Sequence, residues 1–198
     1  MSAVIETKMD ITLGARVVEF QRVISSMEVT DASGKPQHAE AAMTGLVNLL
    51  KELRQRGGHL YVIGNGGSAG VASHAVTDFV NVGKLRATTL HDSALLTCMS
   101  NDYGYENAFA RILLTMASSR DVLIAISSSG QSKNMRNAAT TMRELGGTAI
   151  TLSGFKRDNP LRSLGDTNVW LDSTDYGMVE IGHQFVLHNL ADRIRLGM

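Results

Sequence analysis

Hydrophobic positions along the chain follow two spacings, one typical of buried strands and one typical of helices. Short, almost continuous apolar runs end in clusters of glycine or serine, and longer segments carry their apolar side chains on one helical face. The runs predict strands at residues 59–63, 86–90, 121–126, 148–152 and 168–171. The helical spacing predicts helices at residues 15–27, 39–55, 68–79, 105–116 and 180–196. It also predicts one helix that begins at residues 94–98, and another between the serine cluster at residues 127–130 and Leu145.

Strands that alternate with helices are typical of a parallel, doubly wound sheet covered on both faces, so we predict an α/β fold. A polar turn at residues 31–37 separates the first two helices, and no internal repeat, low-complexity tract or linker interrupts the later pattern. We therefore predict one domain over residues 1–198, in which about the first 56 residues form an N-terminal helical extension.

Composition narrows the class of protein. The 198 residues include 19 basic and 19 acidic side chains, so the formal net charge is zero. Binders of nucleic acid or anionic membranes normally carry a basic excess, and we expect neither partner. No uninterrupted apolar stretch suits a membrane span or a signal peptide. The single cysteine, Cys98, excludes an intrachain disulfide and lies in an apolar pattern that predicts a buried thiol. These features favour a cytoplasmic globular protein.

Two turns between a predicted strand and the next helix are rich in small polar residues. The first is GNGGS, which begins at Gly64, and the second is SSSGQS, which begins at Ser127. In an open parallel sheet, ligands bind beyond the carboxyl ends of the strands, where a helix N-terminus presents free N–H groups to anions. The serine hydroxyls add donors that suit a phosphate monoester. Neither turn has the P-loop lysine, so we expect a phosphate that is held rather than transferred.

Two other interpretations of these turns stay open at this point. Each turn alone fits an ordinary loop with a serine helix cap. The first also fits the dinucleotide-binding pattern G-x-G-x-x-A, through Gly64, Gly66 and Ala69. That fold needs an acidic residue about 20 positions further on. Asp92 lies 28 positions beyond Gly64, which is a poor fit.

A second group of residues can ionise. His74 and Asp78 lie four apart on one predicted helix, and Glu180 and His188 lie eight apart on the last one, so each pair can face one region. Two imidazoles and two carboxylates suit zinc, nickel, iron or manganese, and equally a general acid and base. In the simpler alternative, His74 is an ordinary polar residue and Glu180 only complements a helix dipole. His183 is either a positioning partner of this group or a helix residue without a role.

Four segments resemble the sugar isomerase (SIS) domain family, and most of all its phosphoheptose isomerases. They are GNGGSAGVASHAVTDF from Gly64, SNDYGYENAFAR from Ser100, DVLIAISSSGQSKN from Asp121 and VEIGHQFVLH from Val179. The resemblance implies a flavodoxin-like, parallel five-stranded sheet flanked by helices. It also implies a homotetramer with active sites where subunits meet. The implied reaction converts sedoheptulose 7-phosphate to D-glycero-D-manno-heptose 7-phosphate, so the expected partners are a phosphorylated sugar and further copies of the chain.

The resemblance also implies roles for individual residues. The expected substrate contacts are Asn65, Gly66, Ser68, Asp92, Ser127, Ser128, Ser129 and Ser132. The expected catalytic residues are Asp78, Glu180 and His188, with a carboxylate as base and His188 as acid. The expected metal is zinc, although another divalent ion would suit the same side chains, and its ligands are His74, Asp78, Glu180 and His188.

Two positions depart from the family pattern, because its catalytic glutamate falls on Asp78 and its metal-site glutamine on Glu180. Asp78 is shorter by one methylene, which either disables the base or retunes it for another substrate. Glu180 adds a charge that would strengthen metal binding. The alternatives are therefore an isomerase for another heptose or octose phosphate, or a non-catalytic SIS adaptor for a partner such as a replication initiator. The retained metal-capable side chains favour the enzyme.

Several other polar residues have less specific interpretations. His38, His59 and His91 lie in or near predicted turns and are expected to be solvated. A polar, aromatic turn contains Asn101, Asp102, Tyr103 and Tyr105, and it serves either the sugar pocket or a subunit contact. The sequence does not decide between these two roles.

Overall fold

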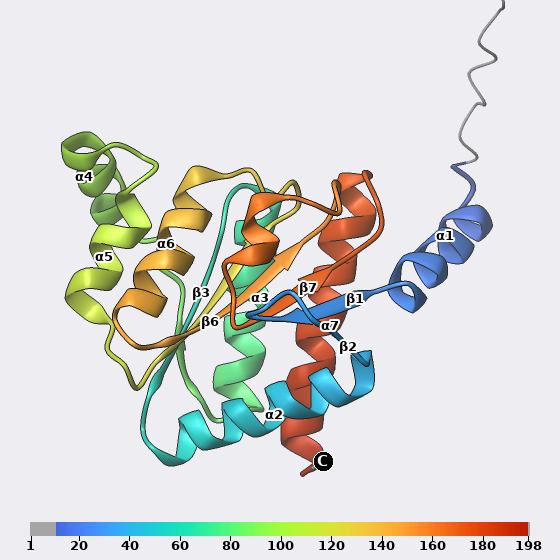
Figure 1. Cartoon of the computed structure of the whole chain (residues 1–198), viewed down its shortest axis with the longest axis horizontal. Coiled ribbons are helices and arrows are strands. Elements are labelled where there is room, and N and C mark those ends of the chain that lie inside the picture. Colours follow the sequence, from blue (N-terminus) through green and yellow to red (C-terminus); the bar gives the residue numbers. More distant parts are fainter. Residues whose placement is uncertain (1–10, 198) are drawn as a thin grey trace, which may run out of the picture.

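The computed structural model describes residues 11–197, which form a seven-stranded sheet with helices on both faces (Figure 1). The strands follow the order β2-β1-β7-β6-β5-β3-β4. Five of them are mutually parallel: β3 (His59–Gly64), β4 (Arg86–Thr88), β5 (Val122–Ser127), β6 (Thr148–Ser153) and β7 (Thr167–Trp170). The predicted α/β class and parallel sheet are confirmed.

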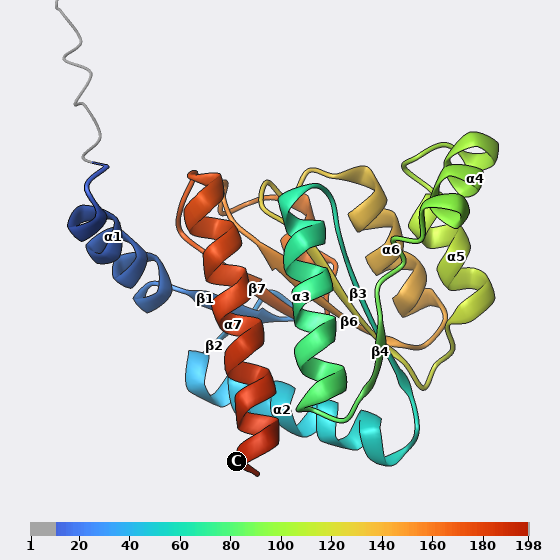
Figure 2. The ribbon, with the colours of Figure 1, turned by 180° about the vertical axis from the view of Figure 1, so that it is seen from behind.

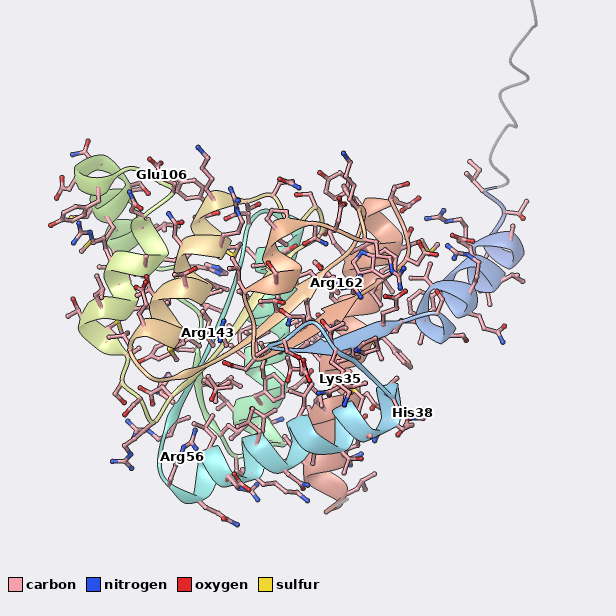
Figure 3. All side chains as sticks on the ribbon, viewed as in Figure 1. Lys35, His38, Arg56, Glu106, Arg143 and Arg162 are labelled. Atoms are coloured by element: carbon pink, nitrogen blue, oxygen red, sulfur yellow. The ribbon has the colours of Figure 1, made fainter. Side chains whose placement is uncertain are left out.

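Two further strands make the predicted number of five wrong. β1 (Glu28–Asp31) and β2 (Pro36–Gln37) form an antiparallel hairpin around the predicted polar turn, and β1 also pairs antiparallel with β7. β1 has only four residues, two of them buried, which is too short a pattern to predict a strand. Arg162, labelled in Figure 3, holds the start of this strand through an ion pair with Glu28 at 2.6 Å. The N-terminal extension thus adds a hairpin to the expected helices.

The described helices are α1 (Leu13–Ser25), α2 (Ala39–Gln55), α3 (Gly67–Asn81), α4 (Ser93–Tyr103), α5 (Ala108–Met116), α6 (Lys133–Glu144), the short 3-10 helix η1 (Pro160–Ser163) and α7 (Tyr176–Leu196). Five of them form two layers, one on each face of the sheet. Helices α2, α3 and α7 pack on one face of the sheet, and α5 and α6 pack on the other. Figure 2 shows α3 and α7 side by side. Among residues 11–197, no helix combines the length and the hydropathy needed to cross a bilayer.

The burial of the strands in the core explains why apolar runs in the sequence predicted them. Leu60 and Val62 of β3 pack against the layer of α2, α3 and α7, whereas Tyr61 and Ile63 pack against the opposite layer. All six residues of β5 are buried, because helices cover both faces of this central strand. A fully buried aliphatic side chain contributes about 1.5–3 kcal/mol to stability, which ties both layers firmly to the sheet.

Helix α4 lies at an outer corner, packed against α5 (Figure 1). None of its residues is fully buried. Cys98 is exposed on this helix, so the predicted buried thiol was wrong. The apolar pattern around it comes from Leu95, Leu96 and Met99, which are partly buried against the core, whereas Cys98 lies on the exposed face of the helix.

The strand order fixes where a ligand can bind. From β3 the chain proceeds to β4 on one side, and the later strands β5, β6 and β7 follow on the other side. In doubly wound sheets, a crevice opens where the order reverses, beyond the carboxyl ends of the two strands involved. Here these strands are β3 and β5, and the turns that follow them are the two small-residue turns of the sequence.

Candidate active site

A pocket of about 250 Å³ lies beyond the carboxyl ends of β3 and β5. Its lining residues are Asn65, Gly66, Gly67, Ser68, Ile126, Ser127, Ser128, Ser129, Ser132, Tyr176 and Glu180. The structure therefore brings all the predicted contacts of the two turns around one space. Asp92 is not among these lining residues. Its side chain instead caps α4 by accepting a hydrogen bond from the Leu95 N–H at 2.8 Å.

Two helices, α3 and α6, begin at this pocket. The residue before α3 is Gly66, with φ +54°, and the residue before α6 is Ser132, and no side chain caps either helix. Uncapped N-termini attract anions through their N–H groups and their dipoles. Ser68 is a buried residue in the first turn of α3, so the open interpretation of this turn as a serine helix cap is wrong. Gly66 takes that position because its positive φ is unfavourable for serine.

The serine turn leaves one hydroxyl without a partner. Ser127 donates to the Ser132 hydroxyl at 3.2 Å, and Ser129 accepts from the Gln131 N–H at 3.2 Å. By contrast, the buried Ser128 hydroxyl has no hydrogen-bond partner among the described residues. A buried polar group without a partner costs about 1–3 kcal/mol. A bound phosphate oxygen would supply the missing partner.

A network of side chains ties the first turn to α6. The Asn65 and Asn134 carboxamides exchange two hydrogen bonds, at 3.0 and 2.9 Å. The Tyr105 hydroxyl donates to the same Asn65 oxygen at 2.7 Å. Tyr105 thus belongs to the pocket's framework within a single chain. This contact agrees with the pocket role that the sequence left open for Tyr105. Asn134 was missed, although it lies within a segment that resembles the SIS family.

The three histidines that were predicted to be solvated differ in their exposure. His38 is exposed as predicted, whereas His59 and His91 are half-buried. His91 accepts a hydrogen bond from the Gly64 N–H at 3.4 Å, so it supports the start of the first turn. Burial lowers the pKa of His91, which keeps its ring neutral and able to accept this bond.

A second cluster joins the neighbouring helices α3 and α7. His74 Nε2 lies 3.0 Å from His188 Nε2, and His188 Nδ1 lies 3.1 Å from Asp78 Oδ2. The same Asp78 oxygen lies 3.5 Å from His74 Nε2. Both histidines are exposed, so the cluster opens to solvent. Three of the four predicted metal ligands thus converge, and Asp78 reaches both imidazoles despite its shorter side chain.

The cluster has the chemistry of a metal site. Asp78 Oδ2 is buried and has no hydrogen-bond donor of acceptable geometry, although two imidazole nitrogens approach it. One ligand atom from each of the three residues falls within 4.8 Å of the others. A buried carboxylate oxygen without a donor suits a cation, and two histidines with a carboxylate suit zinc. The residues present therefore fit a divalent metal.

Glu180 lies apart from this cluster. Its carboxylate packs on Gly67 at the pocket, and a β-carbon at that glycine would collide with both carboxylate oxygens. His188 follows two helical turns later, about 12 Å along the axis at 1.5 Å per residue. Within one chain, Glu180 faces the serine turn and His188 faces the metal-capable cluster. The predicted role of Glu180 as a metal ligand stays a prediction.

Comparison with known proteins places this geometry in a family. A family model described as the SIS domain matches residues 28–154. The chain belongs to the SIS-domain family. The phosphoheptose isomerase of Citrifermentans bemidjiense is 34% identical over 159 residues, which cover 77% of this SIS-domain chain and 82% of that protein. The phosphoheptose isomerase of Helicobacter pylori strain P12 is 34% identical over 154 residues, which cover 75% and 80% of the two chains.

Solved structures agree with this SIS-domain fold. Phosphoheptose isomerase from Neisseria gonorrhoeae superimposes with a TM-score of 0.77 and 26% identity, covering 92% of this chain and 96% of that one. A phosphoheptose isomerase from Francisella tularensis gives a TM-score of 0.78 at 22% identity, covering 90% and 92%. The second similarity supports the fold alone.

His183 connects α7 to the sheet of this SIS domain. It is fully buried, and its Nε2 donates to the Ser153 carbonyl at the end of β6, at 3.1 Å. Burial lowers the pKa of His183 to about 4, while the bond to Ser153 partly opposes this shift. The ring is therefore neutral in the folded chain at neutral pH. It holds α7 in place from behind the face that carries Glu180 and His188.

This burial predicts a loss of stability in acid. Unfolded His183 has an ordinary pKa of about 6.5, so between pH 6.5 and 4 the unfolded chain binds the extra proton. The contribution of neutral His183 is complete above pH 6.5 and is lost as the pH falls towards 4. The free energy of unfolding should drop by about 2 kcal/mol between pH 8 and pH 5 on this account alone.

Urea unfolding at both pH values measures this loss in the unchanged protein and in His183→Gln, whose amide can still donate to Ser153. The variant should lose about 2 kcal/mol less on acidification. His38→Gln, at an exposed histidine, is the matched control and should keep the full pH dependence. Equal losses in the unchanged protein and His183→Gln would contradict the assignment.

Proposed function

We propose that this chain is a phosphoheptose isomerase that interconverts sedoheptulose 7-phosphate and D-glycero-D-manno-heptose 7-phosphate. One observation carries the proposal: an anion pocket and a metal-capable acid–base cluster lie along the same pair of helices, α3 and α7. The relatives named phosphoheptose isomerase cover most of the chain and supply the substrate class.

The pocket suits the phosphate end of the substrate. Serine hydroxyls and two uncapped helix N-termini surround it. The unpartnered Ser128 hydroxyl donates to a phosphate oxygen in this proposal. Binding the phosphate far from the reacting carbons positions the other end of the sugar, which lowers the barrier by orienting C1 and C2.

An acid and a base act at the other end of the substrate. A carboxylate, Asp78 or alternatively Glu180, takes a proton from C1 of the ketose, and His188 gives a proton to the carbonyl oxygen on C2. The product of these two transfers is the enediol. Proton return to C2 and loss of the proton on O1 then leave the aldose. The approach of His188 Nδ1 to Asp78 orients its ring for this exchange.

The proposal includes zinc as the metal, held by His74, Asp78 and His188. A bound zinc ion would polarise the substrate's oxygens and stabilise negative charge on the enediolate. The buried, unpartnered Asp78 oxygen and the two converging imidazoles support this assignment.

The proposal also includes a homotetramer whose interfaces adjoin the active site. Leu13 and Val17 of α1, and Ile181 and Phe185 of α7, are exposed apolar side chains. The ring of Phe20 packs edge-on against Phe185 at 5.9 Å, so the two helices form one surface. This surface borders His188, and burying it against another copy would shield the cluster from water. Light scattering should give the mass of a tetramer, and a monomeric mass would contradict this part.

Another heptose or octose phosphate stays the alternative substrate, because Asp78 and Glu180 depart from the family pattern. An adaptor without catalysis is disfavoured by the intact cluster. The cytoplasmic location expected from the sequence stays a prediction.

Incubation with sedoheptulose 7-phosphate in deuterated water tests the proposal. We expect formation of the aldose phosphate with deuterium at C2, since the proton passes through a group that exchanges with solvent. Other ketose heptose and octose phosphates run in parallel distinguish the substrates. A zinc-loaded protein that neither converts nor exchanges any of them would refute the isomerase proposal.

A further inference from the structure

The two helices of the active site face each other along matched rows. Gly67 and His74 lie on one face of α3, and Glu180 and His188 lie on one face of α7. At the pocket end, Glu180 packs on Gly67. At the other end, His74 Nε2 lies 3.0 Å from His188 Nε2. The rows therefore run side by side from the serine turn to the metal-capable cluster.

The middle positions of these rows are Gly70 on α3 and Gln184 on α7, each one turn from both ends. A β-carbon at Gly70 would meet no heavy atom within 4 Å, so the helix leaves open space there. Gln184 Nε2 is buried and has no acceptor among the described residues. A glycine inside a helix and a buried donor without a partner both lower stability. Neither is explained by packing.

We propose that the middle of the sugar's carbon chain binds in the open space beside Gly70, and that the Gln184 amide donates to one of its hydroxyls. This inference rests on the proposed isomerase function. With the phosphate at the serine turn and the carbonyl carbons at the cluster, the rest of the carbon chain must pass the middle positions of the two rows. Rotation about the terminal torsion of Gln184 turns its amide towards the sugar. The donor then gains the acceptor it lacks in the free protein.

Filling the open space gives the first test. Gly70→Leu should raise the melting temperature, because leucine is the better helix former. It should also weaken binding of sedoheptulose 7-phosphate at least tenfold by calorimetry. Affinity for inorganic phosphate, which needs only the serine turn, should change less than twofold. Gly45→Leu is the matched control, since Gly45 is an exposed helical glycine of α2 with equally open surroundings. It should raise the melting temperature without altering either affinity.

Removing the donor gives the second test. Gln184→Leu keeps the side-chain size, so the melting temperature of the free protein should stay or rise, and kcat/KM for the heptulose phosphate should fall about tenfold. Analogues lacking the hydroxyl at C3, C4 or C5 identify its acceptor. With the analogue that lacks this acceptor hydroxyl, the kcat/KM values of Gln184→Leu and of the unchanged protein should differ less than twofold.

The outcomes separate this inference from the function on which it rests. Unchanged protein that converts the sugar, with both variants binding and converting it within twofold of normal, would overturn the assignment of Gly70 and Gln184 alone. A lower melting temperature for Gln184→Leu with unaltered kcat/KM would also overturn it, since Gln184 would then be structural. Unchanged protein that binds phosphate but neither binds nor converts the sugar would contradict the isomerase proposal as well.

Discussion

Asp78→Asn protein is expected to convert sedoheptulose 7-phosphate at least about a hundredfold more slowly than the unchanged protein, and to hold less zinc. A positioned general base contributes about 10²–10⁴ in rate, and a carboxamide cannot accept the proton. The substitution also removes the negative charge that faces two imidazoles, from His74 at 3.5 Å and His188 at 3.1 Å. Steady-state kinetics and elemental analysis of the purified protein measure the two losses.

Glu180→Gln separates the two candidate bases. If Asp78 is the base, this variant should keep zinc and most of kcat, because Glu180 lies at the pocket, two turns from the cluster. A larger loss of kcat in Glu180→Gln than in Asp78→Asn would assign the base to Glu180. Glu52→Gln, at an exposed carboxylate of α2, controls for the loss of one charge and should leave rate and zinc unchanged. Retention of normal zinc and rate by Asp78→Asn would exclude a role for Asp78 in this cluster.

The pocket beyond β3 and β5 was predictable because its signals are local. Each wall is a buried apolar strand followed directly by a turn of small residues and a helix, and these features lie within about ten positions of sequence. In a parallel sheet, neighbouring carboxyl ends meet at one edge. Asn65 and Ser128 therefore come together without any knowledge of side-chain packing. The β1–β2 hairpin gave no comparable signal, because so few of its residues are buried.

The cluster was only partly predictable, since helical spacing gives the direction of a side chain but not its partner. His74 and His188 are 114 positions apart, and only the packing of α3 on α7 brings their rings together. Glu180 shares a helix face with His188, which the sequence showed. Two helical turns nevertheless separate them, so one reaches the serine turn and the other reaches His74.

The other large effect is expected at the pocket. Ser128→Ala should raise KM for sedoheptulose 7-phosphate by about 10–100-fold, because a hydrogen bond to a charged group is worth about 1.5–3 kcal/mol. The effect should fall mainly on KM, since the phosphate is bound in both the ground state and the transition state. Steady-state kinetics over a wide range of substrate concentrations measure the change in KM.

Ser128→Ala should weaken substrate binding without lowering the stability of the free protein. The Ser128 hydroxyl is buried and unpartnered in the free protein, so its removal should leave the melting temperature unchanged or raise it slightly. Ser163→Ala, at an exposed serine of η1 that donates to the Pro160 carbonyl, is the control and should keep KM. Unaltered KM in Ser128→Ala would show that the phosphate is held without this hydroxyl. A stable protein with weakened substrate binding would instead show that the missing partner of Ser128 is the substrate itself.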